Sequence, residues 1–113
     1  MTKWYVAHLG MRIKRAQDAA PFGVFLADDG DTVMLEFYAN PKVSVPNYAS
    51  MDPLLLHLAF RASDVAAERA RLIAAGATPV GDVMTNETGD TVAMLRDPWG
   101  MAVQLVKRVD PMI

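Results

Sequence analysis

The stretch "LRDPWGMAVQLVKR", residues 95–108, decides how this sequence is interpreted. Asp97-Pro98-Trp99-Gly100 is typical of a tight turn, because proline and glycine favour the backbone angles that a turn needs. The apolar run that follows, residues 101–107, predicts a strand, yet Gln104 places a polar amide in the middle of it. Buried amides need hydrogen-bond partners, so Gln104 is the first candidate functional residue.

The composition bounds the class of protein before any single residue is considered. The chain has 113 residues, of which 52% are hydrophobic and 21% charged, as in one globular domain. The net charge of −2, without a basic block, argues against a nucleic acid partner. No apolar run approaches the ~20 residues of a membrane helix, which argues against a membrane partner. The absence of cysteine excludes disulfides and thiol ligands, and it is compatible with the cytoplasmic location that we expect.

The first half of the chain predicts one short helix and three strands. We expect the helix over residues 3–9, ending at Gly10, and the strands over 11–15, 21–27 and 32–38. Gly30 is expected to supply the positive φ of a hairpin turn between the last two strands. We assign residues 1–40 to a partial first module and residues 41–53, which are rich in proline and asparagine, to a linker.

The second half, residues 54–109, predicts a complete module. We expect a strand over 54–62, a helix capped by Ser63 or Asp64 that extends to Gly76, and strands over 78–84, 91–96 and 101–107. The two halves therefore form an internal repeat, whose first copy lacks its opening strand and half its helix. We expect the DNA upstream of Met1 to encode that missing strand in frame.

Three polar residues lie inside apolar strands: Glu36 in "TVMLEFY", His57 in "LLLHLAF" and Gln104 in "MAVQLVK". Apolar neighbours on both sides predict that both faces of each strand are covered. A buried carboxylate is costly unless it is paired, so Glu36 needs a partner, either His57, Gln104 or a metal ion. Taken singly, such residues are more often hydrogen-bonded core residues. Together, carboxylate, imidazole and amide suit Zn²⁺, Fe²⁺, Mn²⁺, Ni²⁺ or Co²⁺.

In order and spacing, several segments resemble the vicinal oxygen chelate superfamily, which includes glyoxalase I, bleomycin-resistance proteins, fosfomycin-resistance enzymes and extradiol dioxygenases. These segments are "WYVAHLGMRI", "VMLEFY", "LLLHLAFRASD", "ARLIAAGAT" and "LRDPWGMAVQLVKR", and they cover nearly the whole chain. The resemblance implies an α+β fold of paired βαβββ modules that form a cupped mixed sheet, with the first module incomplete. It implies metal ligands at Glu36, His57 and Gln104, and a homodimer in which one chain's Glu36 meets the other's His57 and Gln104.

Two functions remain open on this resemblance. One is a glyoxalase-like lyase or isomerase, or a dioxygenase, that uses a divalent ion (Zn, Ni, Mn or Fe) on a small substrate with vicinal oxygens. Many catalytic members have glutamate where this chain has Gln104, and an amide cannot accept a proton at neutral pH. The alternative is therefore a small-molecule binding or sequestering protein of the bleomycin-resistance type. Arg61 and Arg96, at strand ends, are candidates for binding an anionic substrate or for exposed ion pairs.

Overall fold

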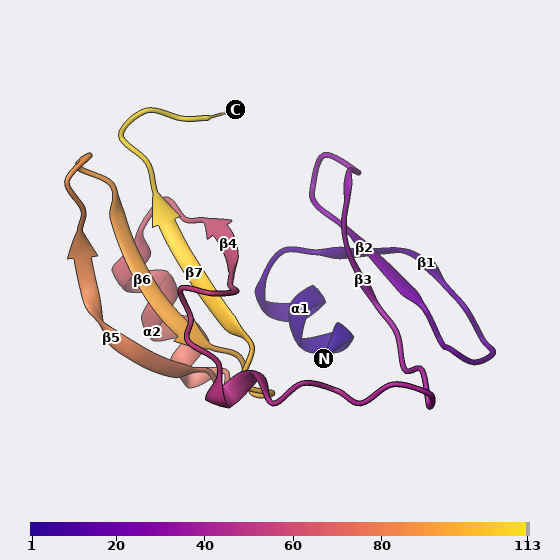
Figure 1. The fold of residues 1–113 in the computed structure, drawn as a ribbon. Coiled ribbons are helices and arrows are strands. Elements are labelled where there is room, and N and C mark those ends of the chain that lie inside the picture. The colour runs from indigo at the N-terminus through magenta and orange to yellow at the C-terminus, as the bar shows by residue number, and fades with distance from the viewer. Residues whose placement is uncertain (113) are drawn as a thin grey trace. The chain divides into compact units, whose positions relative to one another are not determined.

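The computed structural model describes residues 1–112, and the chain divides into two compact units, Met1–Pro46 and a second that begins at Asn47. The first unit contains α1 (Thr2–His8), β1 (Arg12–Ala16), β2 (Val24–Ala27) and β3 (Val33–Phe37). The second contains η1 (Tyr48–Ser50), β4 (Leu58–Arg61), α2 (Val65–Ala74), β5 (Thr78–Thr85), β6 (Thr91–Arg96) and β7 (Ala102–Lys107) (Figure 1). The predicted α+β class is confirmed. Neither of the helices found in this part of the chain is long and apolar enough to cross a membrane.

The second unit is the complete βαβββ module. Its sheet has the order β4-β7-β6-β5, with β4 parallel to β7 and the other neighbours antiparallel. α2 packs against one face of this sheet (Figure 1), and the Asp64 carboxylate caps it by accepting a hydrogen bond from the Ala67 N–H at 3.0 Å. Leu72, Leu95 and Val103 form the fully buried centre between helix and sheet. The predicted helix and its cap at Asp64 are therefore confirmed.

The first unit has the same order of elements but no strand before its helix. Its three-stranded sheet is β1-β2-β3, and the ring of Tyr5 on α1 packs edge-on against Phe37 with centroids 5.0 Å apart. In the second unit β4 pairs along the outer edge of β7, whereas in residues 1–112 β3 pairs with β2 alone. The incomplete first module that the repeat predicted is therefore present in the fold.

One expectation about this sheet is wrong. We predicted that both faces of each strand are covered, and β7 agrees, but β3 does not. α1 packs on the side that carries Phe37, while Met34 and Tyr38 are 59% and 57% exposed and Glu36 is exposed as well. Apolar residues on both sides of a strand show that burial is favourable, but one short helix covers only one face of a sheet.

The predicted strand over 54–62 is also too long, because β4 begins only at Leu58. Asp52 starts a turn instead: its carboxylate accepts a hydrogen bond from the Leu54 N–H at 2.9 Å, and its carbonyl accepts one from the Leu55 N–H at 3.0 Å. Leu54 and Leu55 are left 80% and 78% exposed. A local Asx turn competes here with the β-ladder, and the apolar run does not reveal it.

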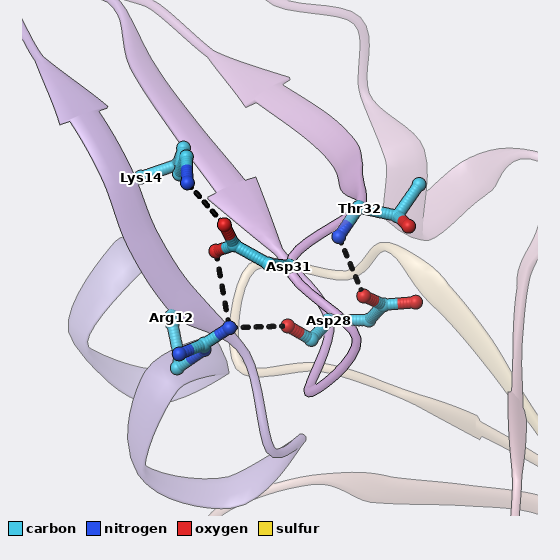
Figure 2. A network of polar contacts seen from close by, with 5 residues as sticks. All are labelled: Arg12, Lys14, Asp28, Asp31 and Thr32. Carbon is cyan, nitrogen blue, oxygen red and sulfur yellow. Dashed lines mark hydrogen bonds and ion pairs between the residues drawn. The ribbon is translucent and has the colours of Figure 1, made fainter.

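In the hairpin between β2 and β3, the residue with positive φ is Asp31 (φ 66°). The expectation that Gly30 supplies the positive φ is therefore wrong. The Asp28 carboxylate accepts a hydrogen bond from the Thr32 N–H at 2.8 Å and closes the turn (Figure 2). Asp31 in turn binds Lys14 and accepts a hydrogen bond from Arg12 at 3.1 Å. The hydrogen bond from Lys14 lowers the pKa of Asp31, with the charges of Lys14 and Arg12 adding to the effect. Aspartate is one of the few residues with a side chain that tolerate this left-handed backbone.

Substitutions at Asp31 separate its backbone role from its charge. Asp31→Gly and Asp31→Asn fit φ 66°, so both should lower the melting temperature only slightly. Asp31→Val should lower it more, because a β-branched residue is strained at positive φ. The small effect of Asp31→Asn should shrink further in high salt, since exposed ion pairs are screened. A valine variant as stable as the glycine variant would contradict the backbone role.

The chain after β7 is fastened to the β5–β6 turn by Asp90, which is only 6% exposed. Its carboxylate accepts hydrogen bonds from the Val109 N–H and from the Arg108 guanidinium, each at 2.9 Å. The Val109 hydrogen bond and the positive charge of Arg108 together lower the pKa of Asp90 against the opposing effect of burial. The ionised form of Asp90 therefore stabilises the folded state.

This pKa shift predicts a pH-dependent stability. Because the pKa of Asp90 is lower folded than unfolded, its contribution is complete above about pH 4 and is lost as the pH falls through the folded value. Thermal unfolding from about pH 7 to about pH 2.5 should show that Asp90→Asn is less stable than wild type at neutral pH, with a gap that narrows in acid. The exposed Asp110→Asn is the matched control. A gap for Asp90→Asn that is independent of pH would contradict the assignment.

Candidate functional site

Gln104 lies on the face of the second sheet that points away from α2. Its neighbours in the chain, Val103 and Leu105, are fully buried on the helix side, and side chains alternate along a strand. The register pairs Gln104 with Met94 on β6 and with Ala59 on β4. The amide is therefore half-buried on a surface formed largely by apolar side chains.

This face contains a pocket of about 300 Å³, and Gln104 forms part of its floor. Three strands and the linker line the pocket, through residues Asp52, Pro53, Leu54, Val80, Gly81, Asp82, Met84, Val92, Ala93, Met94 and Gln104. The rim on β5 is a bulge, because the register between β5 and β6 shifts between Val80 and Met84 and Gly81 has φ 69°. Bulges are frequent beside functional sites, where they turn side chains toward a ligand.

Another part of the rim is formed by Asp52 and Pro53, the last linker residues, and by Leu54, which follows them. We call these three residues the linker wall. Arg96, at the end of β6, binds the segment that directly precedes the linker wall. One guanidinium nitrogen donates hydrogen bonds to the carbonyls of Tyr48 and Gly100 at 2.9 and 3.0 Å, and another to that of Met51 at 2.8 Å. These contacts engage Arg96 with backbone carbonyls in place of the exposed ion pair that was one expectation for it; anion binding, the other, stays a prediction.

The Asp97–Gly100 turn packs closely against η1 of the linker. The buried Asp97 carboxylate accepts hydrogen bonds from the N–H groups of Trp99 and Met101, each at 2.9 Å. Gly100 has φ 90°, and a Cβ there would lie 2.7 Å from the Cβ of Ala49 and 2.9 Å from its backbone nitrogen. Glycine is therefore needed for the backbone angle and for the close approach of η1.

His57 lies directly before β4 and is half-buried. Its Nδ1 is 2.7 Å from the carbonyl oxygen of Pro53, a linker-wall residue. Because a carbonyl only accepts, Nδ1 carries the proton, and in the neutral ring Nε2 then has the lone pair. Histidines that bind metals are commonly oriented by such a bond. His57 does not itself line the pocket, and it is joined to it through Pro53.

Glu36 is in the first unit, on β3 opposite Phe25. It is exposed, and one carboxylate oxygen lies 3.6 Å from the place where a Cβ on Gly23 would be. Water solvates an exposed carboxylate, so the prediction that Glu36 is buried and therefore requires a partner is wrong. His57 and Gln104 belong to the second unit. In residues 1–112, no group of three or more His, Cys, Asp or Glu side chains is placed to hold a metal.

Arg69 is a further contributor to the pocket that the sequence did not reveal. It projects from α2 and donates a hydrogen bond to the carbonyl of Gly81 at 2.9 Å, which fastens the bulge that forms the β5 rim. The sequence signal was Gly81, since a glycine within a predicted strand often marks a bulge.

Comparison with known proteins gives one family and many similar folds. The family model described as Glyoxalase/Bleomycin resistance protein/Dioxygenase superfamily matches residues 1–105. No curated protein sequence matches the chain.

Three solved structures illustrate the structural similarity. SMU.1112c is 27% identical with a TM-score of 0.66, over 93% of this chain and 86% of that one. TnmS3, an antibiotic binding protein from Streptomyces sp. CB03234, is 26% identical with a TM-score of 0.61, over 91% and 79%. A glyoxalase I mutant from Zea mays is 22% identical with a TM-score of 0.71, over 96% of this chain and 40% of that one, which is a likeness of fold.

Proposed function

The chain belongs to the glyoxalase/bleomycin resistance protein/dioxygenase superfamily, and we propose that its second unit binds an apolar small molecule in the pocket above Gln104. The pocket itself carries the proposal. Its volume of about 300 Å³ is that of a site for a small organic molecule, and most of its lining is apolar with a few polar groups. Such a lining binds by burial of apolar surface, and the polar groups orient the ligand.

Gln104 suits the orienting role. An amide both donates and accepts hydrogen bonds, so it can meet either kind of polar group on a ligand. It carries no charge that would oppose apolar burial, and it cannot act as a general base at neutral pH. The similarity to TnmS3, an antibiotic binding protein, supports a binding role without chemistry.

Filling the pocket tests this proposal. Val92 on β6 lines the hollow, whereas Val83 on β5 does not, so Val92→Phe and Val83→Phe form a matched pair. The neutral fluorophore N-phenyl-1-naphthylamine should bind wild type and Val83→Phe alike, and Val92→Phe at least about tenfold more weakly because the added ring takes its space. Equal binding by both variants, or no binding by wild type, would reject the pocket as the site.

A metal-dependent activity is the second candidate, and the orientation of His57 favours it. Glu36, His57 and Gln104 are the proposed ligands, with His57 offering Nε2 because Nδ1 is engaged by Pro53. A bound divalent ion would supply Lewis-acid chemistry toward a substrate with vicinal oxygens, of the lyase, isomerase or dioxygenase type. His57 and Gln104 come from one unit and Glu36 from the other, so we further propose that the active species is a homodimer.

Metal titration tests this candidate. Adding Zn²⁺, Ni²⁺, Mn²⁺ or Fe²⁺ should raise the melting temperature of wild type, and His57→Ala, Glu36→Gln or Gln104→Leu should each reduce the increase. His8→Ala, on α1, controls for binding to surface histidines. The molar mass of the metal-loaded protein, measured by light scattering, shows whether two copies assemble. No increase with any ion, or an increase that only His8→Ala removes, would reject this candidate.

A further inference from the structure

We propose that Arg96 is the positioning residue of the pocket: it holds the linker wall in place and so sets how long a bound ligand is retained. The inference rests on the proposed binding site, because it concerns the wall of that same pocket. It assigns Arg96 no contact with the ligand, and its effect runs through Tyr48 and Met51 to Asp52–Leu54.

The guanidinium of Arg96 contacts both ends of η1 and the turn after β6. Tyr48 begins η1 and Met51 follows its end, so the two carbonyls that Arg96 binds bracket the 3₁₀ helix. The third carbonyl, of Gly100, belongs to the turn between β6 and β7. Arginine is always charged and presents its donors in a rigid planar fork, so a single side chain can join the linker to the sheet.

Apolar packing holds the linker wall only weakly. Leu54 and Leu55 are 80% and 78% exposed, so burial of apolar surface contributes little to the position of this segment. A further tie is the hydrogen bond between His57 and Pro53 at the far end of the wall. A segment with few buried apolar contacts has a low free energy of local opening, and its hydrogen bonds then control that opening.

The linker wall follows directly after Met51, whose carbonyl Arg96 binds. Asp52 is the residue after Met51, and its carboxylate fixes the turn through the Leu54 N–H. With the turn fixed in this way, a displacement of Met51 carries the whole wall with it. The close approach of Ala49 to Gly100 limits such displacement from the other side.

The test compares Arg96→Met and Arg96→Lys with Arg61→Met in the full chain. Methionine keeps an unbranched apolar stem without donors, lysine keeps the charge but not the fork, and Arg61 is an exposed arginine at the end of β4. Two readouts are needed. Hydrogen exchange reports the opening of residues 47–56, and stopped-flow fluorescence reports the dissociation of N-phenyl-1-naphthylamine.

We expect Arg96→Met to speed exchange in residues 47–56 while β6 and β7 stay protected, and to speed dissociation about tenfold, as for loss of a charge-assisted hydrogen bond. Arg96→Lys, which is the milder change, should be intermediate in both readouts, and Arg61→Met should match wild type. This ordered pattern would not arise from a general loss of stability.

Two results would overturn the proposal. Exchange that rises evenly across β5, β6 and β7 in both Arg96 variants would show a general structural role. Exchange that rises in residues 47–56 without faster dissociation would show that the wall does not retain the ligand. Failure of wild type to bind the fluorophore is a different result, which rejects the proposed site, and the exchange data then still decide whether Arg96 holds the linker.

Discussion

The hydrogen bonds from Arg96 to three backbone carbonyls are the interaction on which the pocket depends. A linker that follows no ladder leaves its carbonyls without regular partners, and proline residues within it remove donors. Arg96 binds the linker carbonyls of Tyr48 and Met51, at the two ends of η1, and joins them to the sheet. The Tyr48 carbonyl also accepts a hydrogen bond from the Met51 N–H at 3.1 Å. Gly100 makes the approach sterically feasible, because a side chain there would collide with Ala49.

The glutamine in the apolar strand is explained by the same arrangement. β7 is buried by α2 on one face and lies in the pocket face on the other. The Gln104 amide at its centre is therefore half-buried and still accessible from the pocket. A charged side chain at Gln104 would have to be desolvated, and an aliphatic one would offer a ligand no orientation. The linker wall makes this position a pocket, since it closes the open side of a sheet that would otherwise face water.

Much of the fold was predictable because its signals are local. Asp64 at the start of α2, Gly10 after α1 and the Asp97–Gly100 turn each act within a few residues, so their patterns gave the right elements. Asp31 was missed because aspartate also adopts positive φ, so the sequence pattern does not choose between Asp31 and Gly30. The internal repeat gave the module order, since similar segments form similar units.

The site was less predictable because its decisive contacts join distant residues. His57 and Gln104 were recognisable as polar residues among apolar neighbours, but the sequence could not show that the Asp52 turn ends the strand before His57. Glu36 was placed in the core because apolar neighbours cannot indicate which face of β3 is covered. Arg96 looked like an exposed charge at a strand end, since two of its three carbonyl partners lie 45 and 48 residues away.

Pro53 has a part in both candidate functions. This residue lines the pocket, and its carbonyl also orients the imidazole of His57. Any ion bound at Nε2 would strengthen the donation from Nδ1–H to Pro53, because metal coordination makes the imidazole N–H more acidic. A metal at His57 would then tighten the far end of the linker wall that Arg96 holds at the near end. On the two proposals together, ligand binding and metal binding would be coupled through the Pro53 carbonyl.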